Sequence, residues 1–148
     1  EGKVCLSLLG TYIGPTPHES EKWNPKLSSL YQIIISIQAQ ILVNRPYFNE
    51  PGYEKSRGTI DGDRKSQLYN ENLQCTSIVA GIINMIKYVD RYPNFKNAIL
   101  SHFYFKKNKI IEHYNLLIQK CNTQQYKTLL INKVEDMTTL FNTLELPN

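Results

Sequence analysis

The stretch E-G-K-V-C-L-S-L-L, residues 1–9, places Cys5 in a short apolar run directly after a Gly-Lys step. A cysteine between Val4 and Leu6 is usually a small buried hydrophobic residue, because a reactive thiol needs exposure and a lowered pKa. These nine residues alone leave a structural and a catalytic interpretation of Cys5 open. The segments that follow favour the catalytic one.

Three further features follow Cys5 in a distinctive order. The two glycines and two prolines of residues 10–22 predict a loop, and a Trp-Asn-Pro-Lys sequence comes next, at residues 23–26. After it comes an apolar segment with helical spacing, residues 27–43, and then a turn that reads N-R-P-Y-F-N-E-P-G-Y-E-K-S-R-G-T at residues 44–59. The prolines and glycine of this turn predict that the helix ends there.

This order resembles the active-site half of a ubiquitin-conjugating enzyme, in which the acceptor cysteine precedes a Trp-x-Pro loop, a central helix and a Pro-rich turn. The segment P-Y-F-N-E-P-G-Y-E, residues 46–54, is most similar to the conjugating domains of the giant BIR-repeat-containing enzymes and of the large hybrid conjugating enzyme/ligases. The resemblance is strong from Gly2 to Thr59 and weaker as far as Phe105. Beyond Phe105 the sequence resembles no family.

The resemblance implies a function and a set of partners. Cys5 is expected to carry ubiquitin as a thioester and to pass it to a lysine of a protein substrate. The partners implied are ubiquitin, the ubiquitin-activating enzyme and a ubiquitin ligase, and no cofactor or metal is implied. Thioester exchange uses a thiolate as nucleophile and as leaving group, and an ordinary thiol suffices for both steps.

The resemblance also implies roles for other residues. Asn49 and Glu50 are expected to orient and deprotonate the incoming lysine, with a solvated turn as the alternative. Ser7 occupies a place where many small conjugating enzymes have Asp, and we expect it to be a polar neighbour of the thiol. Pro25 and Lys26 are expected to contact the ligase together with Trp23, whose large ring we expect to pack under the preceding loop.

The fold class that the resemblance implies is α+β. The sheet, the N-terminal helix and the His-Pro-Asn motif with the oxyanion asparagine would precede Glu1. The chain does not begin with Met, so we expect a fragment that covers the helical C-terminal half of the conjugating core. Its activity alone is doubtful. The expected division is a core at residues 1–106 and an all-helical extension at residues 107–148.

Apolar spacing predicts the helices. The central one begins at Ser28 or Ser29 and runs to about Val43, and five of its residues are expected to be buried: Leu30, Ile33, Ile34, Ile37 and Ile41. A second helix is expected over residues 70–91, a third over 95–105, and two more from Ile110 to Cys121 and from Leu129 to Leu144. Residues 54–66 are rich in charge and glycine, and we expect an exposed, mobile loop there.

Composition limits the alternatives. The chain has 148 residues, 41% of them hydrophobic, and a net charge of +4, which fits one globular domain and gives no strong indication of nucleic-acid binding. Its three cysteines form no C-x-x-C pair, so neither a disulfide framework nor a zinc site is indicated, and a reducing cytoplasm or nucleus is expected. No run of apolar residues is long enough to span a bilayer.

Two other functions remain open at this point. One is a conjugating-like scaffold that binds ubiquitin or a ligase without carrying a thioester. The other is an unrelated, mildly basic helical binding module. A cysteine–histidine nucleophile pair with His18 is disfavoured, because a histidine in a loop is ordinarily solvated and no orienting Asn or Asp motif accompanies it.

Overall fold

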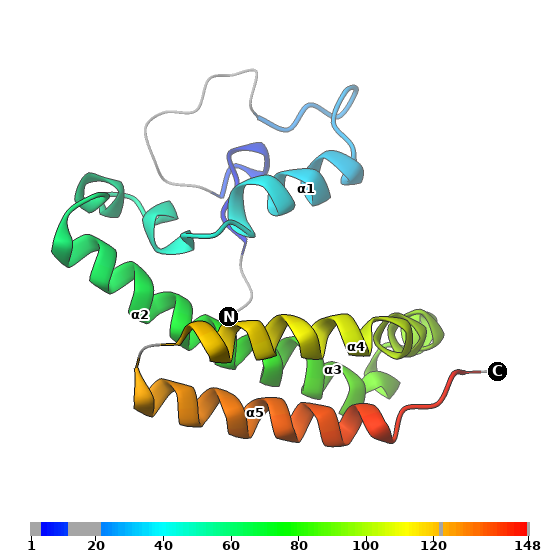
Figure 1. The fold of residues 1–148 in the computed structure, drawn as a ribbon. Helices are drawn as coiled ribbons and strands as arrows, with labels where there is room; N and C mark the ends of the chain where they lie inside the picture. The colour runs from blue at the N-terminus through cyan, green and yellow to red at the C-terminus, as the bar shows by residue number, and fades with distance from the viewer. Residues whose placement is uncertain (1–3, 12–21, 122, 148) are drawn as a thin grey trace. The chain divides into compact units, whose positions relative to one another are not determined.

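The computed structural model describes residues 4–11, 22–121 and 123–147, and the chain divides into two compact units, Glu1–Asn70 and Glu71–Asn148. The α-helices, shown in Figure 1, are α1 (Leu30–Ser36), α2 (Ile60–Thr76), α3 (Asn84–Lys87), α4 (Lys96–Lys120) and α5 (Gln124–Asn142). The short 3-10 helices are η1 (Ser7–Leu9), η4 (Pro46–Asn49), η5 (Tyr53–Ser56), η7 (Val89–Arg91) and η8 (Pro93–Phe95), and two segments are π-helical, η3 (Ile37–Ile41) and η6 (Ser77–Ile83). The residues described contain no strand, so the helical part of the expectation is met and the α+β class is not confirmed. The predicted domain boundary at residue 106 stays a prediction.

The central helix begins where its cap was predicted. The Ser29 hydroxyl accepts a hydrogen bond from the Gln32 N–H at 3.4 Å, and the Gln32 side-chain oxygen accepts one from the Ser29 N–H at 2.9 Å. This reciprocal pair satisfies two backbone donors that a helix start leaves free. The helix continues through η3 to Ile41, which confirms the predicted extent to within two residues.

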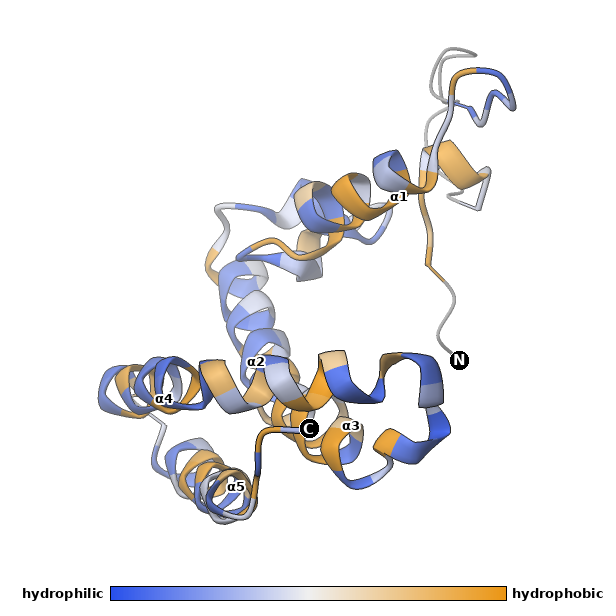
Figure 2. Cartoon of the chain, turned by 90° about the vertical axis from the view of Figure 1, so that its right-hand side faces the viewer, coloured by the Kyte–Doolittle hydropathy of each residue, from blue (hydrophilic) through white to orange (hydrophobic). Residues whose placement is uncertain are grey.

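The burial predicted for this helix is wrong. No residue of α1 or η3 is buried, and the side chains of Leu30 and Ile34 are 70% and 54% exposed. In Figure 2 the ribbon of α1 alternates between orange, hydrophobic residues and blue, hydrophilic ones. Ile33, Ile37 and Ile41 are half-buried, and η3 contacts η4.

Two helix boundaries differ from the prediction. The charged segment at residues 54–66 was expected to be a loop, but α2 begins at Ile60. Its first turn is stabilised by ion pairs from Asp61 to Arg64, at 3.1 Å, and to Lys65, at 2.6 Å, which lie three and four residues along the helix.

The second difference concerns α4. Two helices were expected on either side of the lysine-rich residues 106–109, but α4 is one continuous helix from Lys96 to Lys120. These lysines interrupt the apolar pattern without breaking the helix.

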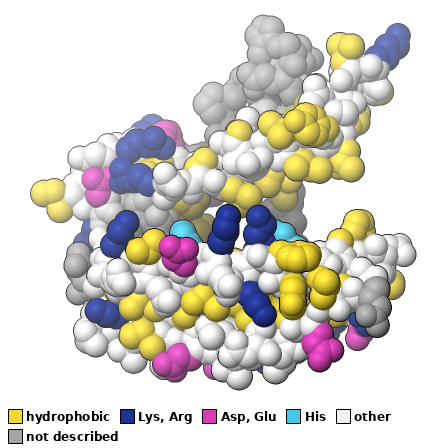
Figure 3. Space-filling view, turned by 45° about the vertical axis from the view of Figure 1, so that its right-hand side comes forward, with side chains coloured by type: hydrophobic (Ala, Val, Ile, Leu, Met, Phe, Trp, Pro, Cys, Tyr) yellow, Lys and Arg dark blue, Asp and Glu magenta, His cyan; other side chains and the backbone are white. Residues whose placement is uncertain are grey.

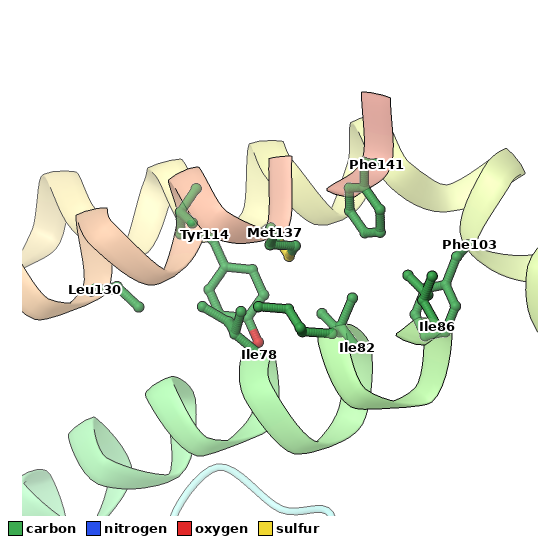
Figure 4. Packing of buried hydrophobic residues seen from close by; sticks show 10 residues of the cluster. Ile78, Ile82, Ile86, Phe103, Tyr114, Leu130, Met137 and Phe141 are labelled. Atoms are coloured by element: carbon green, nitrogen blue, oxygen red, sulfur yellow. The ribbon is translucent and has the colours of Figure 1, made fainter. Parts of the chain in front are cut away.

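The second unit has an apolar core between its helices. Figure 1 shows α4 and α5 antiparallel, and both contact the segment formed by η6 and α3. Figure 4 shows Ile78, Ile82 and Ile86 from that segment facing residues of α4 and α5. The fully buried residues of α5 in this core are Leu130, Met137 and Phe141. Burial of each such side chain contributes about 1.5 to 3 kcal/mol to the packing of these helices. Across the described residues, no helix has the length and apolar content that a membrane span requires.

Candidate functional site

The backbone on both sides of Cys5 is held by one side chain. The Thr11 hydroxyl donates to the Val4 carbonyl at 2.7 Å and accepts from the Leu6 N–H at 3.1 Å. The Thr11 N–H donates to the Leu6 carbonyl at 3.3 Å, and Leu6 itself is buried, with 2% of its surface exposed. Cys5 lies between these two anchored residues and is exposed. The cysteine is thus presented to solvent on a fixed backbone.

A tight turn closes this segment. Ser7 begins η1, and its carbonyl accepts a hydrogen bond from the Gly10 N–H at 2.9 Å. Gly10 has φ 63°, in the left-handed region that glycine adopts without a steric penalty. Ser7 is half-buried, and its proposed role beside the thiol stays a prediction.

The other two cysteines have different surroundings. Cys75 is half-buried in α2, and burial raises the pKa of its thiol. Cys121 is half-buried, caps the end of α4 and donates its S–H to the Thr123 carbonyl at 3.4 Å. Cys5 is therefore the exposed thiol of the three.

The Trp-Asn-Pro-Lys segment is an exposed turn organised by Asn24. Its side-chain oxygen accepts from the Lys26 N–H at 2.9 Å, and its carbonyl accepts from the Ser28 N–H at 2.7 Å. Trp23 is 44% exposed, and because most of the preceding loop lies outside the described residues, the packing of its ring under that loop stays a prediction. Pro25 and Lys26 are exposed as expected. This turn can present its side chains to another protein, and the partner-binding role of all three residues stays a prediction.

The turn after the central helix is built around one aromatic ring. Phe48 in η4 is 4% exposed, and the guanidinium groups of Arg45 and Arg57 lie 4.6 Å and 5.1 Å from its ring centroid. Arg45 also forms an ion pair with Asp63 of α2. The Arg45 guanidinium holds the pKa of the Asp63 carboxyl below its ordinary value, with a further contribution from the Gly58 N–H. These contacts join the turn to the first turns of α2.

Asn49 and Glu50 lie on the outside of this turn, and both are exposed. The Asn49 side-chain N–H donates to the Gln40 carbonyl at 2.7 Å, which ties the turn to the end of the central helix. The Asn49 side-chain oxygen remains available to accept a hydrogen bond from another group. In the described part of the chain the Glu50 carboxylate has no hydrogen bond or ion pair, while the Glu50 carbonyl accepts from the Tyr53 N–H at 3.0 Å.

The predicted residues thus lie on three segments of the first unit. Among the described residues, no hydrogen bond or ion pair connects Cys5 or Ser7 with Asn49 or Glu50, and their joint role stays a prediction. Thr11 is the residue that sequence reasoning missed. Its bond to Val4 spans seven residues, and no local pattern signals such a contact. His18 lies outside the described residues. Within residues 4–11, 22–121 and 123–147, no three His, Cys, Asp or Glu residues are arranged to hold a metal ion.

Several curated proteins are similar to this chain. It is 44% identical over 111 residues to the human protein named Dual E2 ubiquitin-conjugating enzyme/E3 ubiquitin-protein ligase BIRC6. The aligned region covers 75% of this chain and 2% of that protein. It is 44% identical over 106 residues to Probable ubiquitin-conjugating enzyme E2 R521 of Acanthamoeba polyphaga mimivirus, covering 72% of this chain and 7% of that protein. A third match, Probable ubiquitin-conjugating enzyme E2 26 of Arabidopsis thaliana, is 42% identical over 115 residues, covering 77% of this chain and 20% of that protein.

These similarities exclude one of the two alternative functions left open by the sequence. Identities of 42% to 44% over about three quarters of the chain rule out an unrelated helical module. The aligned region spans only 2% to 20% of these relatives. No protein-family model matches the chain.

Proposed function

The chain is a homologue of ubiquitin-conjugating enzymes over about three quarters of its length, and we propose that it carries ubiquitin as a thioester on Cys5 and transfers it to a substrate lysine. The observation that supports Cys5 as the acceptor is its exposure on a backbone that Thr11 fixes on both sides. A fixed nucleophile reacts faster, because less orientational freedom is lost when it meets the incoming thioester.

The first step is a thioester exchange. The Cys5 thiolate attacks the ubiquitin carboxyl carbon, which is held as a thioester on the activating enzyme. The new C–S bond forms as the bond to the activating enzyme's sulfur breaks, and that sulfur leaves as a thiolate. No amine takes part, so this step places no demand on Asn49 or Glu50.

The second step is aminolysis of the thioester. A lysine amine attacks the same carbon, the Cys5 thiolate leaves, and the amine loses a proton. A lysine with an ordinary pKa of about 10.4 is almost wholly protonated at neutral pH, so the step needs an acceptor for that proton. In this proposal Glu50, whose carboxylate is exposed, accepts the proton. The side-chain oxygen of Asn49 orients the amine.

Single-turnover discharge tests the assignment of the second step. The full gene product is charged with ubiquitin, the activating enzyme is quenched, and free lysine is added. Glu50→Gln should charge at the parental rate and discharge more slowly by ~10². Glu54→Gln is the matched control, because Glu54 is an exposed carboxylate of the same turn that accepts from the Gly52 N–H at 2.6 Å. Equal discharge by both variants and the parent would remove Glu50 from the mechanism.

A scaffold that binds ubiquitin or a ligase without carrying a thioester is the second candidate. The observation that favours it is the apolar exposure of the turn before the central helix, where Trp23 and Leu27 are 44% and 77% exposed. Such a surface suits a protein partner. A chain that binds ubiquitin or a ligase yet never forms a reducible adduct would support the scaffold over the enzyme.

A further inference from the structure

The outward surface of α4 carries an excess of positive charge. Its 25 residues include five lysines and one glutamate. Lys96 pairs with Asp90 at 2.7 Å, and Lys107 lies 4.8 Å from the ring centroid of Tyr104. In the described part of the chain, no carboxylate pairs with Lys106 or Lys109.

These two lysines share one helix face with aromatic, histidine and leucine side chains. Residues spaced three and four apart lie on the same side of an α-helix. We call this set the α4 basic face: His102, Phe105, Lys106, Lys109, His113 and Leu116. All six are exposed, and Phe105 and Leu116 are 68% and 47% exposed. Figure 3 shows basic and histidine side chains gathered in a row along this unit.

Other helices of the chain balance their charges differently. On α2, Asp61 pairs with Arg64 and Lys65, and on α5, Lys133 lies 3.4 Å from Asp136. Such pairs three and four residues apart are typical of a helix surface that only faces water. The α4 basic face has exposed apolar groups between its cations and lacks such pairs among the described residues. That combination is typical of a surface that contacts a partner.

We propose that the α4 basic face binds an acidic, amphipathic segment of another protein. The lysines attract its carboxylates, and Phe105 and Leu116 cover its apolar side chains. A nucleic acid is disfavoured, because its binding rests mainly on many phosphate contacts, whereas this face offers two unpaired lysines and a leucine that neither pairs with phosphate nor stacks on a base. The proposal concerns the second unit and is independent of the thioester chemistry.

Fluorescence anisotropy with three labelled probes tests the proposal. The probes are a helical peptide that alternates Glu with Leu on one face, a poly-glutamate peptide of equal charge, and a single-stranded oligonucleotide of equal charge. The chain should bind the amphipathic peptide at least ~10-fold more tightly than either of the others, because only that probe uses both the cations and the apolar groups. The affinity should fall as salt rises.

Charge reversal assigns the binding to this face. The double variant K106E/K109E should lose at least ~10-fold in affinity, since it places like charges opposite the peptide. The matched control K55E/K87E makes the same change in net charge at two other exposed lysines and should bind like the parent. Circular dichroism verifies that both variants keep their helices. An equal loss in both variants, no binding of the amphipathic peptide, or tighter binding of the oligonucleotide would overturn the proposal. F105A should weaken binding of the amphipathic peptide several-fold. An unchanged affinity would contradict the proposed contact between Phe105 and the peptide's apolar side chains.

Discussion

The Thr11 hydroxyl lies 2.7 Å from the Val4 carbonyl oxygen and donates to it across seven residues of chain. The Thr11 hydroxyl oxygen also accepts a hydrogen bond from the Leu6 N–H, at 3.1 Å. One side chain therefore satisfies a backbone acceptor and a backbone donor on opposite sides of Cys5. These two bonds tie the backbone on both sides of Cys5 to one residue, and we expect Thr11 to position the thiol.

Replacement of Thr11 tests that role. Thr11→Val keeps the shape of the side chain and removes both side-chain hydrogen bonds, each worth about 0.5 to 1.5 kcal/mol. We expect charging of Cys5 to slow by ~10-fold, because the thiol loses its fixed position. Thr11→Ser retains the hydroxyl and should charge near the parental rate. Equal charging rates for the Val and Ser variants would show that the hydroxyl does not position Cys5.

The three cysteines should differ in reactivity. Only a thiolate is alkylated, and Cys75 is half-buried with a raised pKa, whereas Cys5 is exposed. At neutral pH we expect iodoacetamide to modify Cys5 at least ~10-fold faster than Cys75. Mass spectrometry of digested samples, taken over time, gives the separate rates. In denaturant the two rates should converge, and if Cys75 reacts first in the folded chain, the described burial is wrong.

The elements that local chemistry determines were predictable from sequence. The start of the central helix follows from the Ser29 and Gln32 side chains, which lie three residues apart, and the last helix follows from its apolar spacing. The first turns of α2 were missed because Gly62 and the charges around it resemble a loop. Those charges pair within the helix, however, and Gly62 packs against Ser56. Whether the preceding turn brings Ser56 against Gly62 does not follow from the spacing of residue types.

In the candidate site, too, features carried by the local sequence could be predicted, and features that depend on the folded chain could not. Cys5 was found because its neighbours in sequence resemble a known motif. The exposure of Trp23 and the contact of Thr11 depend on which residues the fold brings nearby. Neither follows from residue type or spacing. The continuity of α4 was missed because charges on the outward face of a helix resemble a break in its apolar pattern.

Gly62 provides a test of the packing at the start of α2. A Cβ built at this buried glycine would lie 2.8 Å from the carbonyl carbon of Ser56 and closer still to its oxygen. Gly62→Ala should therefore lower the free energy of unfolding by about 1 to 3 kcal/mol, as overpacking does. Gly81→Ala is the control, because nothing lies within 4 Å of its Cβ position, and it should be neutral or stabilising by up to about 1 kcal/mol. Urea unfolding measures both. Similar free energies for the two variants would contradict the contact with Ser56.

The ion pair of Arg45 and Asp63 predicts a pH dependence. Since the pKa of the Asp63 carboxyl is lowered in the folded chain, the pair stabilises the fold above the unfolded pKa of about 3.9 and stops doing so as the pH falls through the lower folded pKa. Asp63→Asn should be less stable than the parent at neutral pH. The difference should shrink below a pH of about 4 and in high salt. Thermal unfolding of both proteins across this range measures it, and a difference that stays constant from neutral to acidic pH would contradict the pair.

The most direct test of the account is the intact mass of the full gene product after incubation with ubiquitin, ATP and the ubiquitin-activating enzyme. The parent and the double variant Cys75→Ala/Cys121→Ala should each gain the mass of one ubiquitin, and a thiol reductant should remove it, because the link is a thioester. Cys5→Ala should gain none. The account is contradicted if Cys5→Ala still acquires a reducible ubiquitin, or if the adduct on the parent maps to Cys75 or Cys121.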